Sequence, residues 1–167
     1  MVRLETVLDS WKSARQDTAQ AVEDFPAAEL DFRPTPELMT FGELARHILD
    51  AGRALTGLLL EGEENFATPG IRERFAQYFS ALAANADAAA LAAELRRDMD
   101  ERCGLLAARD AGFYAHEVTR LDGVRVTRLE LLQFVKEHEL THRSQMFLYL
   151  RLKGIVPPTT RRRQARR

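Results

Sequence analysis

Apolar side chains recur at spacings of three and four residues over four long stretches of the chain. The clearest stretch lies in the C-terminal half, where Leu131, Val135, Met146 and Tyr149 fall on one stripe. This spacing matches the turn of an α-helix and predicts an amphipathic helix with one face on a core. The same periodicity predicts long helices over residues 3–22, 40–61, 87–108 and 127–153.

Polar residues mark where three of these helices begin. Thr40 is followed three residues later by Glu43, and Thr127 is followed in the same way by Glu130. Both pairs have the capping-box pattern, in which the two side chains bind free amides of the first helical turn. Asp87 is a third candidate N-cap.

Three segments depart from the long helical pattern. Prolines at positions 26, 34 and 36 exclude a continuous helix between residues 23 and 39. Apolar residues after Pro69 predict a shorter helix reaching toward Leu82, and the alanine-rich residues 81–93 favour helix as well. Residues 112–126 alternate around Asp122-Gly123, which predicts a small β-hairpin with a type I′ turn.

These elements predict an all-α protein, a four-helix bundle of the up-and-down type with a small hairpin before the last long helix. We expect one bundle domain over residues 1–158 and a disordered basic tail over residues 159–167. Gly42, Gly52 and Gly57 in the second helix indicate close approach by a neighbouring element.

Composition narrows the class of protein. With 46% hydrophobic and 29% charged residues, the chain is typical of a soluble globular domain. It contains no run of about 20 apolar residues that would span a membrane. Its first residues, MVRLETVLDSWKS, lack the apolar core of a signal peptide, so we expect a cytoplasmic protein. The single cysteine, Cys103, excludes an internal disulfide and is expected to be a small packing residue.

Charge gives little support for a nucleic-acid partner. The net charge is −1, and five of the 24 basic residues lie in the last seven positions, RRRQARR. No basic stripe with interleaved aromatic residues occurs elsewhere, so we interpret this segment as a solvated tail.

The candidate chemistry lies in the histidines. His138 and His142 are four residues apart on the apolar stripe of the last long helix, and His47 lies on the core-facing flank of the second. Imidazoles placed against a core need a partner for their lone pairs, which is either an ordinary hydrogen bond or a metal ion. Imidazole binds zinc, nickel, copper and iron, so these residues alone do not choose the metal. His116 falls in the predicted hairpin and is not expected to be a ligand.

The segment HELTH, residues 138–142, also has the HExxH pattern of zinc metalloproteases. In that pattern the glutamate, here Glu139, is the general base, and a third ligand lies downstream. No histidine, glutamate or aspartate follows His142 in this chain. The protease interpretation therefore lacks a ligand.

Two longer motifs carry a family resemblance. GELARHILDAGRALTGLLLEG and, some ninety residues on, LLQFVKEHELTHRSQMFLYLRLKGIVPP resemble the DinB superfamily, which includes relatives of the bacillithiol transferases and mycothiol-dependent isomerases. The resemblance extends over nearly the whole chain. It implies a four-helix bundle with that family's own connectivity, a homodimer, and a divalent metal, zinc or nickel, on His47, His138 and His142. Glu139 and Gln145 are candidates for orienting these ligands, and ordinary packing or solvent contact is the alternative role for both.

The resemblance also bears on activity without fixing it. Characterised members use the metal to bind a low-molecular-weight thiol and transfer it to an electrophile, so thiol S-transfer in detoxification is the first hypothesis. A non-catalytic, stress-linked metal-binding or interaction protein is the alternative, and a metal-dependent hydrolase is a third. The thiol would come from outside the chain unless Cys103 serves.

Overall fold

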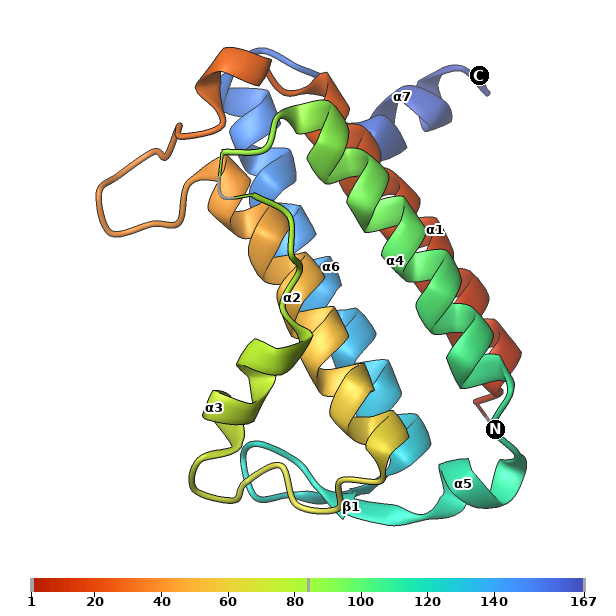
Figure 1. The fold of residues 1–167 in the computed structure, drawn as a ribbon. Coiled ribbons are helices and arrows are strands. Elements are labelled where there is room, and N and C mark those ends of the chain that lie inside the picture. Colours follow the sequence, from red (N-terminus) through yellow and green to blue (C-terminus); the bar gives the residue numbers. More distant parts are fainter. Residues whose placement is uncertain (1, 84, 167) are drawn as a thin grey trace.

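The computed structural model describes residues 2–83 and 85–166 and contains the predicted all-α bundle. Four long helices account for most of the chain, and a two-stranded hairpin precedes the last of them, as the sequence predicts (Figure 1). The elements in chain order are α1 (Leu4–Asp24), the 3-10 turn η1 (Ala27–Glu29), α2 (Phe41–Glu61), α3 (Ile71–Phe75), the 3-10 turn η2 (Ala76–Tyr78), α4 (Ala88–Ala107), α5 (Ala111–Ala115), β1 (Glu117–Thr119), β2 (Arg125–Thr127), α6 (Arg128–Leu152) and α7 (Pro158–Gln164).

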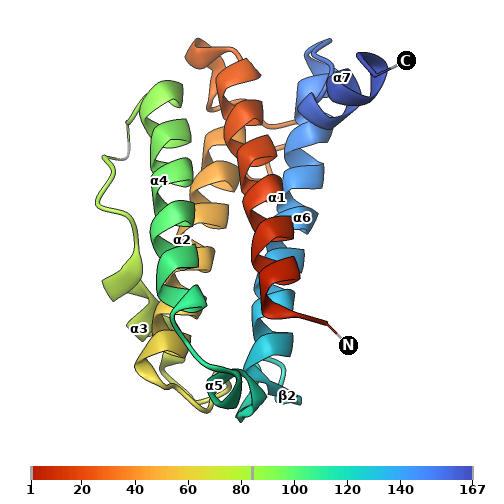
Figure 2. The same ribbon diagram turned by 90° about the vertical axis from the view of Figure 1, so that its right-hand side faces the viewer.

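The four long helices do not alternate in direction along the chain. Figure 1 shows α1 and α6 running one way, and α2 and α4 both running the other way. The main packing pairs are α1 with α4 and α2 with α6, and Figure 2 shows the first pair in front of the second. The up-and-down order expected from periodicity alone is therefore wrong, because the described residues 62–83 lead back along the bundle before α4 begins.

The predicted helix starts are confirmed. The Thr40 side chain accepts a hydrogen bond from the Glu43 amide at 3.1 Å, and the Glu43 carboxylate accepts from the Thr40 amide at 2.7 Å. Thr127 and Glu130 form the same reciprocal pair at the start of α6. Asp87 caps α4 by accepting from the Ala90 amide at 2.8 Å. Local side-chain chemistry fixes where the helices begin.

The hairpin forms with a different turn from the one predicted. Val118 lies opposite Val126, and the ladder continues to a hydrogen bond from the Arg120 amide to the Val124 carbonyl. Gly123 has a φ of 83°, and no described residue other than glycine has a positive φ. A type I′ turn needs two positive φ values, so the loop is instead the three-residue kind that ends with glycine in the left-handed region.

The segment before α4 is irregular where the sequence predicts helix. Helix α3 ends at Phe75, and the described residues 79–83 and 85–87 lie outside any helix or strand. Side chains of α2 bind this backbone directly: Asp50 accepts from the Ser80 amide, and Arg46 donates to the Leu82 carbonyl. These contacts replace the hydrogen bonds that a helix would make, so tertiary structure overrides alanine's helix propensity.

The core is divided into two apolar clusters along the bundle. One cluster includes Trp11 and Leu131, and the other includes Phe41 and Tyr149. Trp11 is 1% exposed and anchors the first of these clusters.

A buried ionic cluster also crosses the interior of the bundle. Arg15, 1% exposed, pairs with Glu139 at 2.9 Å and with Asp98 at 3.4 Å. Trp11 and Thr18 donate to the same Glu139 carboxylate at 2.6 and 2.8 Å. The cluster draws on all four long helices and balances three arginines against three carboxylates: Arg15, Arg53, Arg102, Glu94, Asp98 and Glu139.

Two glycines of α2 make room for neighbouring side chains, as the sequence indicates. A Cβ on Gly52 would lie 3.1 Å from the Arg15 guanidinium, and a Cβ on Gly57 would lie 2.3 Å from the Tyr78 ring. Gly52 therefore admits the buried arginine. Gly57 admits the aromatic ring that begins the irregular segment.

The C-terminal residues form helix α7 where the sequence predicts a disordered tail. Arg161 pairs with Asp24 at 2.6 Å, and Arg162 pairs with Asp17, so both arginines bind carboxylates of α1. Pro158 stands in the first turn, where its fixed φ suits a helix start. Among the described helices, none has both the length and the apolar character needed to cross a membrane.

Candidate metal centre

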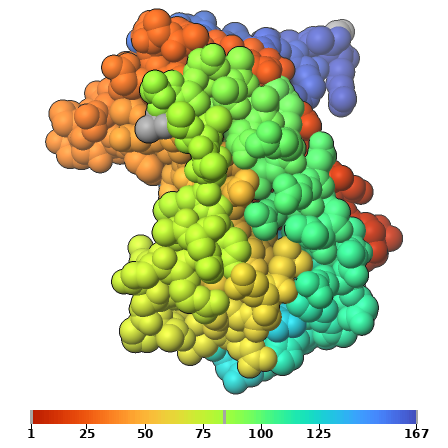
Figure 3. All heavy atoms as spheres, viewed as in Figure 1, coloured from red at the N-terminus to blue at the C-terminus, as the bar shows by residue number. Residues whose placement is uncertain are grey.

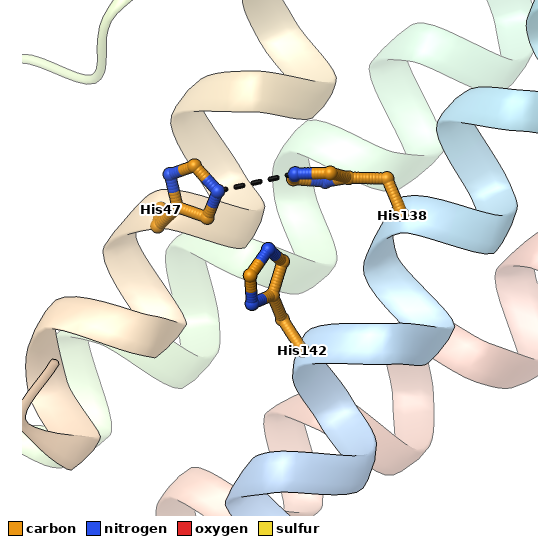
Figure 4. Close-up of side chains that lie close together, drawn as sticks. All are labelled: His47, His138 and His142. Carbon is orange, nitrogen blue, oxygen red and sulfur yellow. Dashed lines mark hydrogen bonds between the residues drawn. The ribbon is translucent and has the colours of Figure 1, made fainter. Parts of the chain in front are cut away.

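Three histidines from two helices converge on one point. His47 of α2 and His138 and His142 of α6 point their rings toward one another (Figure 4). The Nε2 atoms of His47 and His138 are 3.1 Å apart, and one ring nitrogen from each of the three lies within 4.8 Å of the others. These are the three residues singled out from the sequence, and no further aspartate, glutamate or cysteine joins the group among the described residues.

The distance between two of the nitrogens fits a single divalent ion. Zinc lies roughly 2.0–2.1 Å from histidine nitrogens, so two ligands at an angle of about 90–110° are about 3.0–3.4 Å apart. The distance between His47 and His138 falls in this range. Three protein ligands leave coordination positions for water or a substrate, which is typical of a catalytic zinc site and not of a closed structural one.

The helices place the cluster at the seam between α2 and α6. His138 and His142 are one turn apart on α6, so their rings stack along one side of that helix. The sequence predicts these histidines on core-facing stripes, but all three are only half-buried. Each step along a helix rotates the side chain by about 100°, so a residue next to a buried one lies at the edge of the core. On α2, Ile48 faces the core and its neighbour His47 therefore lies on the flank.

Burial keeps two of the rings neutral. Desolvation lowers the pKa of His138 to about 4, with the neighbouring His142 and His47 adding to the shift. Desolvation also lowers the pKa of His47, and His142 is again the second cause. A neutral imidazole has the lone pair that a metal requires, so these rings are prepared for ligation at neutral pH.

Gln145 contacts one of the three histidines. Its Oε1 lies 2.9 Å from Nδ1 of His142. An amide oxygen only accepts hydrogen bonds, so Nδ1 donates the proton and Nε2 keeps its lone pair. This is the arrangement by which proteins fix the tautomer of a metal-binding histidine.

Glu139 makes no hydrogen bond to any of the three histidines, and its place in the core agrees with the packing role that the sequence also allows. Its carboxylate is 2% exposed and accepts from Trp11, Arg15 and Thr18 on the opposite side of α6. One position along a helix rotates the side chain by about 100°, which separates Glu139 from its neighbour His138.

The same contacts exclude the metalloprotease arrangement. A general base must reach a metal-bound water, but both oxygens of Glu139 are occupied by buried donors. The third histidine, His47, comes from upstream of the HExxH segment and not from downstream.

The remaining histidine and the cysteine lie outside the cluster. His116 is exposed and contacts Glu64 at 2.9 Å. Cys103 is 2% exposed in the core, and desolvation raises its pKa to about 11. A buried thiol that resists ionisation is a packing residue and not a nucleophile.

A cleft of about 390 Å³ opens beside two of the histidines. His47 and His138 form part of its wall, and the remaining lining is mostly apolar. Sequence reasoning did not find this cleft, although Asp50 gives one signal, since it follows His47 by three residues on the same face of α2. The other lining residues are Ala51, Leu55, Arg72, Phe75, Phe79, Leu121 and Phe134.

Solved structures with the same fold include two proteins of Bacillus subtilis. A DinB-like protein, YjoA, has 22% sequence identity and a TM-score of 0.67 over 89% of this chain and 92% of its own. YfiT, described as a probable metal-dependent hydrolase with an unusual four-helix bundle topology, has 18% identity and a TM-score of 0.70 over 93% of this chain and 91% of its own.

A third similar structure is a mycothiol-dependent maleylpyruvate isomerase. It has 17% identity and a TM-score of 0.63, covering 87% of this chain and 61% of its own. At these identities the likeness shows the fold and not the activity. No curated protein matches the chain in a sequence comparison.

The sequence model of one family covers almost the entire chain. It is described as the DinB family and matches residues 1–166, a span that includes all three clustered histidines. The order of the helices in the bundle agrees with that match. So do the similar structures, one described as DinB-like and the other as having an unusual four-helix bundle topology. The chain therefore belongs to the DinB family.

Proposed function

We propose that this protein is an enzyme that depends on one divalent ion, zinc or nickel, bound by His47, His138 and His142. The observation that carries the proposal is the convergence of three histidine nitrogens beside a mostly apolar cleft. An ion bound there would lower the pKa of a thiol or water and hold the ionised form ready for attack.

The reaction we favour is transfer of a low-molecular-weight thiol to an electrophile, a detoxification chemistry. The only cysteine of the chain is buried with a raised pKa, so the attacking thiol must come from outside the protein. The similar structure that is described as mycothiol-dependent supports a small thiol as cosubstrate.

The protein's own residues have separate tasks in this proposal. His47 and His138 both bind the ion and form part of the cleft wall, so a ligand of the ion is adjacent to any molecule in the cleft. Gln145 fixes the tautomer of His142. The apolar lining excludes water from the acceptor and so disfavours hydrolysis.

Hydrolysis is the second candidate, because YfiT is described as a probable metal-dependent hydrolase. The same histidines would then activate water instead of a thiol. A non-catalytic metal-binding protein is the remaining alternative. The cleft beside the histidines favours an enzyme over this reading, since a purely structural metal needs no access for substrate.

The first experiment measures bound metal. Purified protein is loaded with Zn²⁺ or Ni²⁺, desalted and analysed for metal per chain. We expect about one ion per chain in the wild type, almost none in His142→Ala, and an unchanged content in the matched control His116→Ala. Equal losses in the two variants would contradict the assignment of ligands.

The second experiment separates the candidate reactions. Metal-loaded wild type and His138→Ala are assayed with several small thiols and a generic electrophile, with and without a chelator, and in parallel with ester substrates. Thiol conjugation that is lost with chelator and in His138→Ala supports S-transfer. Metal-dependent ester hydrolysis without conjugation would favour the hydrolase. If neither reaction depends on metal, the remaining hypothesis is the non-catalytic metal-binding protein.

A further inference from the structure

The cleft beside the histidines has an aromatic wall that is open to solvent. Phe75, Phe79 and Phe134 line it from three different segments, and Phe79 is 47% exposed. Exposed phenylalanine costs free energy in water, and a group of such rings around one hollow is a feature of ligand sites.

This wall is held in place by α2. The Asp50 carboxylate accepts from the Ser80 amide at 2.8 Å, and Arg53 donates through Nε to the Tyr78 carbonyl at 2.7 Å. Phe79 stands between these two anchored residues. Its exposure is therefore a fixed feature of the fold and not the result of an unattached loop.

A single cation without a partner lies at the edge of the same cleft. Arg72 lines the cleft from α3, at the junction with a second hollow of about 260 Å³. Its guanidinium makes no hydrogen bond or ion pair with any described residue. Its helix neighbour Arg74, by contrast, pairs with Glu61 and Glu63. Figure 3 shows the yellow-green surface of α3 and the following residues projecting beside α2.

The cleft therefore combines apolar and cationic recognition. We propose that it binds a small aromatic or bulky apolar molecule that carries a carboxylate or similar anionic group, with Arg72 pairing to the anion. The apolar body lies against Phe75, Phe79 and Phe134, and the opposite end reaches His47 and His138. This inference rests on the proposed function and names the class of its acceptor substrate.

Asp50 is the one acidic residue of the lining, and it does not oppose this arrangement. It belongs to the α2 wall, whereas Arg72 belongs to α3. Its carboxylate accepts the Ser80 amide and is attracted by Arg53 and Arg46. The anion is therefore placed at the α3 edge, away from this carboxylate.

The binding test uses two fluorescent probes that differ in charge. 8-Anilinonaphthalene-1-sulfonate is aromatic and anionic, whereas N-phenyl-1-naphthylamine is aromatic and neutral. Both are titrated into wild type, Arg72→Gln and the matched control Arg74→Gln. We expect Arg72→Gln to weaken binding of the anionic probe about tenfold, which corresponds to about 1.4 kcal/mol, because it removes a charge-assisted hydrogen bond. Binding of the neutral probe should be unchanged. Arg74→Gln should change neither.

Two further arms locate the probe. A larger groove of about 640 Å³ lies between the N-terminal residues and α5, and Ala111→Arg fills it. We expect this variant to bind the anionic probe as the wild type does. Naphthalene-1-carboxylate should displace the probe, and glutathione, a polar anionic thiol, should not.

Several results would overturn the inference. They are equal affinity of wild type and Arg72→Gln for the anionic probe, weakening by Ala111→Arg alone, or displacement by glutathione but not by the aromatic carboxylate. Metal content keeps this test separate from the proposed function. If Arg72→Gln has a normal metal content and unchanged probe binding, the proposed acceptor class is wrong and the proposed function stands. If the wild type binds no metal but its probe binding depends on Arg72, the metal-dependent function is wrong and the proposed ligand class stands.

Discussion

At the scale of single residues, Glu139 and His138 show how one step along a helix separates two roles. His138 lies in the histidine cluster, and Glu139 lies in the core with Arg15 and Trp11. Removing the Glu139 carboxylate would leave the Arg15 guanidinium buried with only its longer contacts to Asp98 and the Leu95 carbonyl. Breaking a buried ion pair in this way costs about 3–5 kcal/mol.

We therefore expect Glu139→Ala to lower the free energy of unfolding by about that amount, measured by urea denaturation. Glu137→Ala is the matched control, since Glu137 is on the same helix but exposed. It should change stability by less than about 0.5 kcal/mol. Similar effects of the two substitutions would show that the carboxylate of Glu139 is not the buried centre described here.

The pH dependence of the metal-free protein follows from His138. Its pKa is lowered from an ordinary 6.5 to about 4 in the fold, so the unfolded chain takes up this proton first as pH falls. Stability from this residue is present above about pH 6.5 and is lost as pH falls toward 4. Urea unfolding of metal-free wild type and His138→Gln at pH 7.0, 5.5 and 4.5 measures it.

We expect the loss of stability between pH 7.0 and 4.5 to be smaller in His138→Gln than in wild type. The difference should stay below roughly 3 kcal/mol, because one pKa unit corresponds to about 1.4 kcal/mol and water reaches this half-buried ring. The carboxylates are the same in both proteins, so their contribution to the pH dependence of stability cancels in the comparison. Identical pH profiles would contradict the lowered pKa.

Residue spacing predicted the grouping of the histidines but not the ionic core. His138 and His142 share a helix face by their separation of four, and the family motif adds His47. The buried partners Arg15 and Glu139 are 124 positions apart, and nothing local distinguishes them from exposed charged residues. Such pairs become visible only when the packing of four helices is known.

At the scale of elements, the irregular segment after η2 depends on a glycine. Tyr78 packs on α2 where a Cβ at Gly57 would lie 2.3 Å from its ring. Gly57→Ala should force this ring away and destabilise the fold by about 1–3 kcal/mol through overpacking. Gly104→Ala is the control, since Gly104 is helical with no atom within 4 Å of an added Cβ.

Gly104→Ala should stabilise the protein by about 0.5–1 kcal/mol, because alanine favours helix more than glycine. Opposite signs for the two substitutions in urea midpoints are therefore the expected result. If Gly57→Ala stabilised the protein as Gly104→Ala does, the close contact with Tyr78 would not exist in solution.

The predictability of each element follows from where its hydrogen bonds are made. Helix starts at Thr40 and Thr127 depend on residues within one turn, and the sequence predicts them correctly. The backbone of residues 80–83 binds side chains of α2 that are 30 or more positions away. The helix predicted there does not form, because the backbone instead makes hydrogen bonds to side chains that are distant in the sequence.

At the scale of the whole molecule, the core of one chain takes up the three consecutive leucines at the end of α2. Leu58 and Leu59 are both 0% exposed within one chain, and Leu60 is partly buried. A single chain therefore accommodates this row, which is not available as a subunit contact. A homodimer remains our expectation from the family resemblance, and it needs a different surface.

The C-terminal half of α6 offers such a surface. Leu148 and Leu152 are 54% and 56% exposed and lie four residues apart on one face of the helix. Two exposed leucines side by side would be buried on pairing with a second copy, which favours association. We propose this face as the contact of a homodimer.

Light scattering coupled to size exclusion measures the mass at micromolar concentration. We expect twice the chain mass of 18.9 kDa for wild type and the single mass for the double variant Leu148→Glu, Leu152→Glu. Each buried glutamate would need a partner for its charge, so the two substitutions should favour the monomer. Leu105→Glu, at an isolated leucine that is 47% exposed on α4, is the control and should remain dimeric. A monomeric wild type would contradict the homodimer. A dimeric double variant would show that the dimer contact lies on another face of the protein.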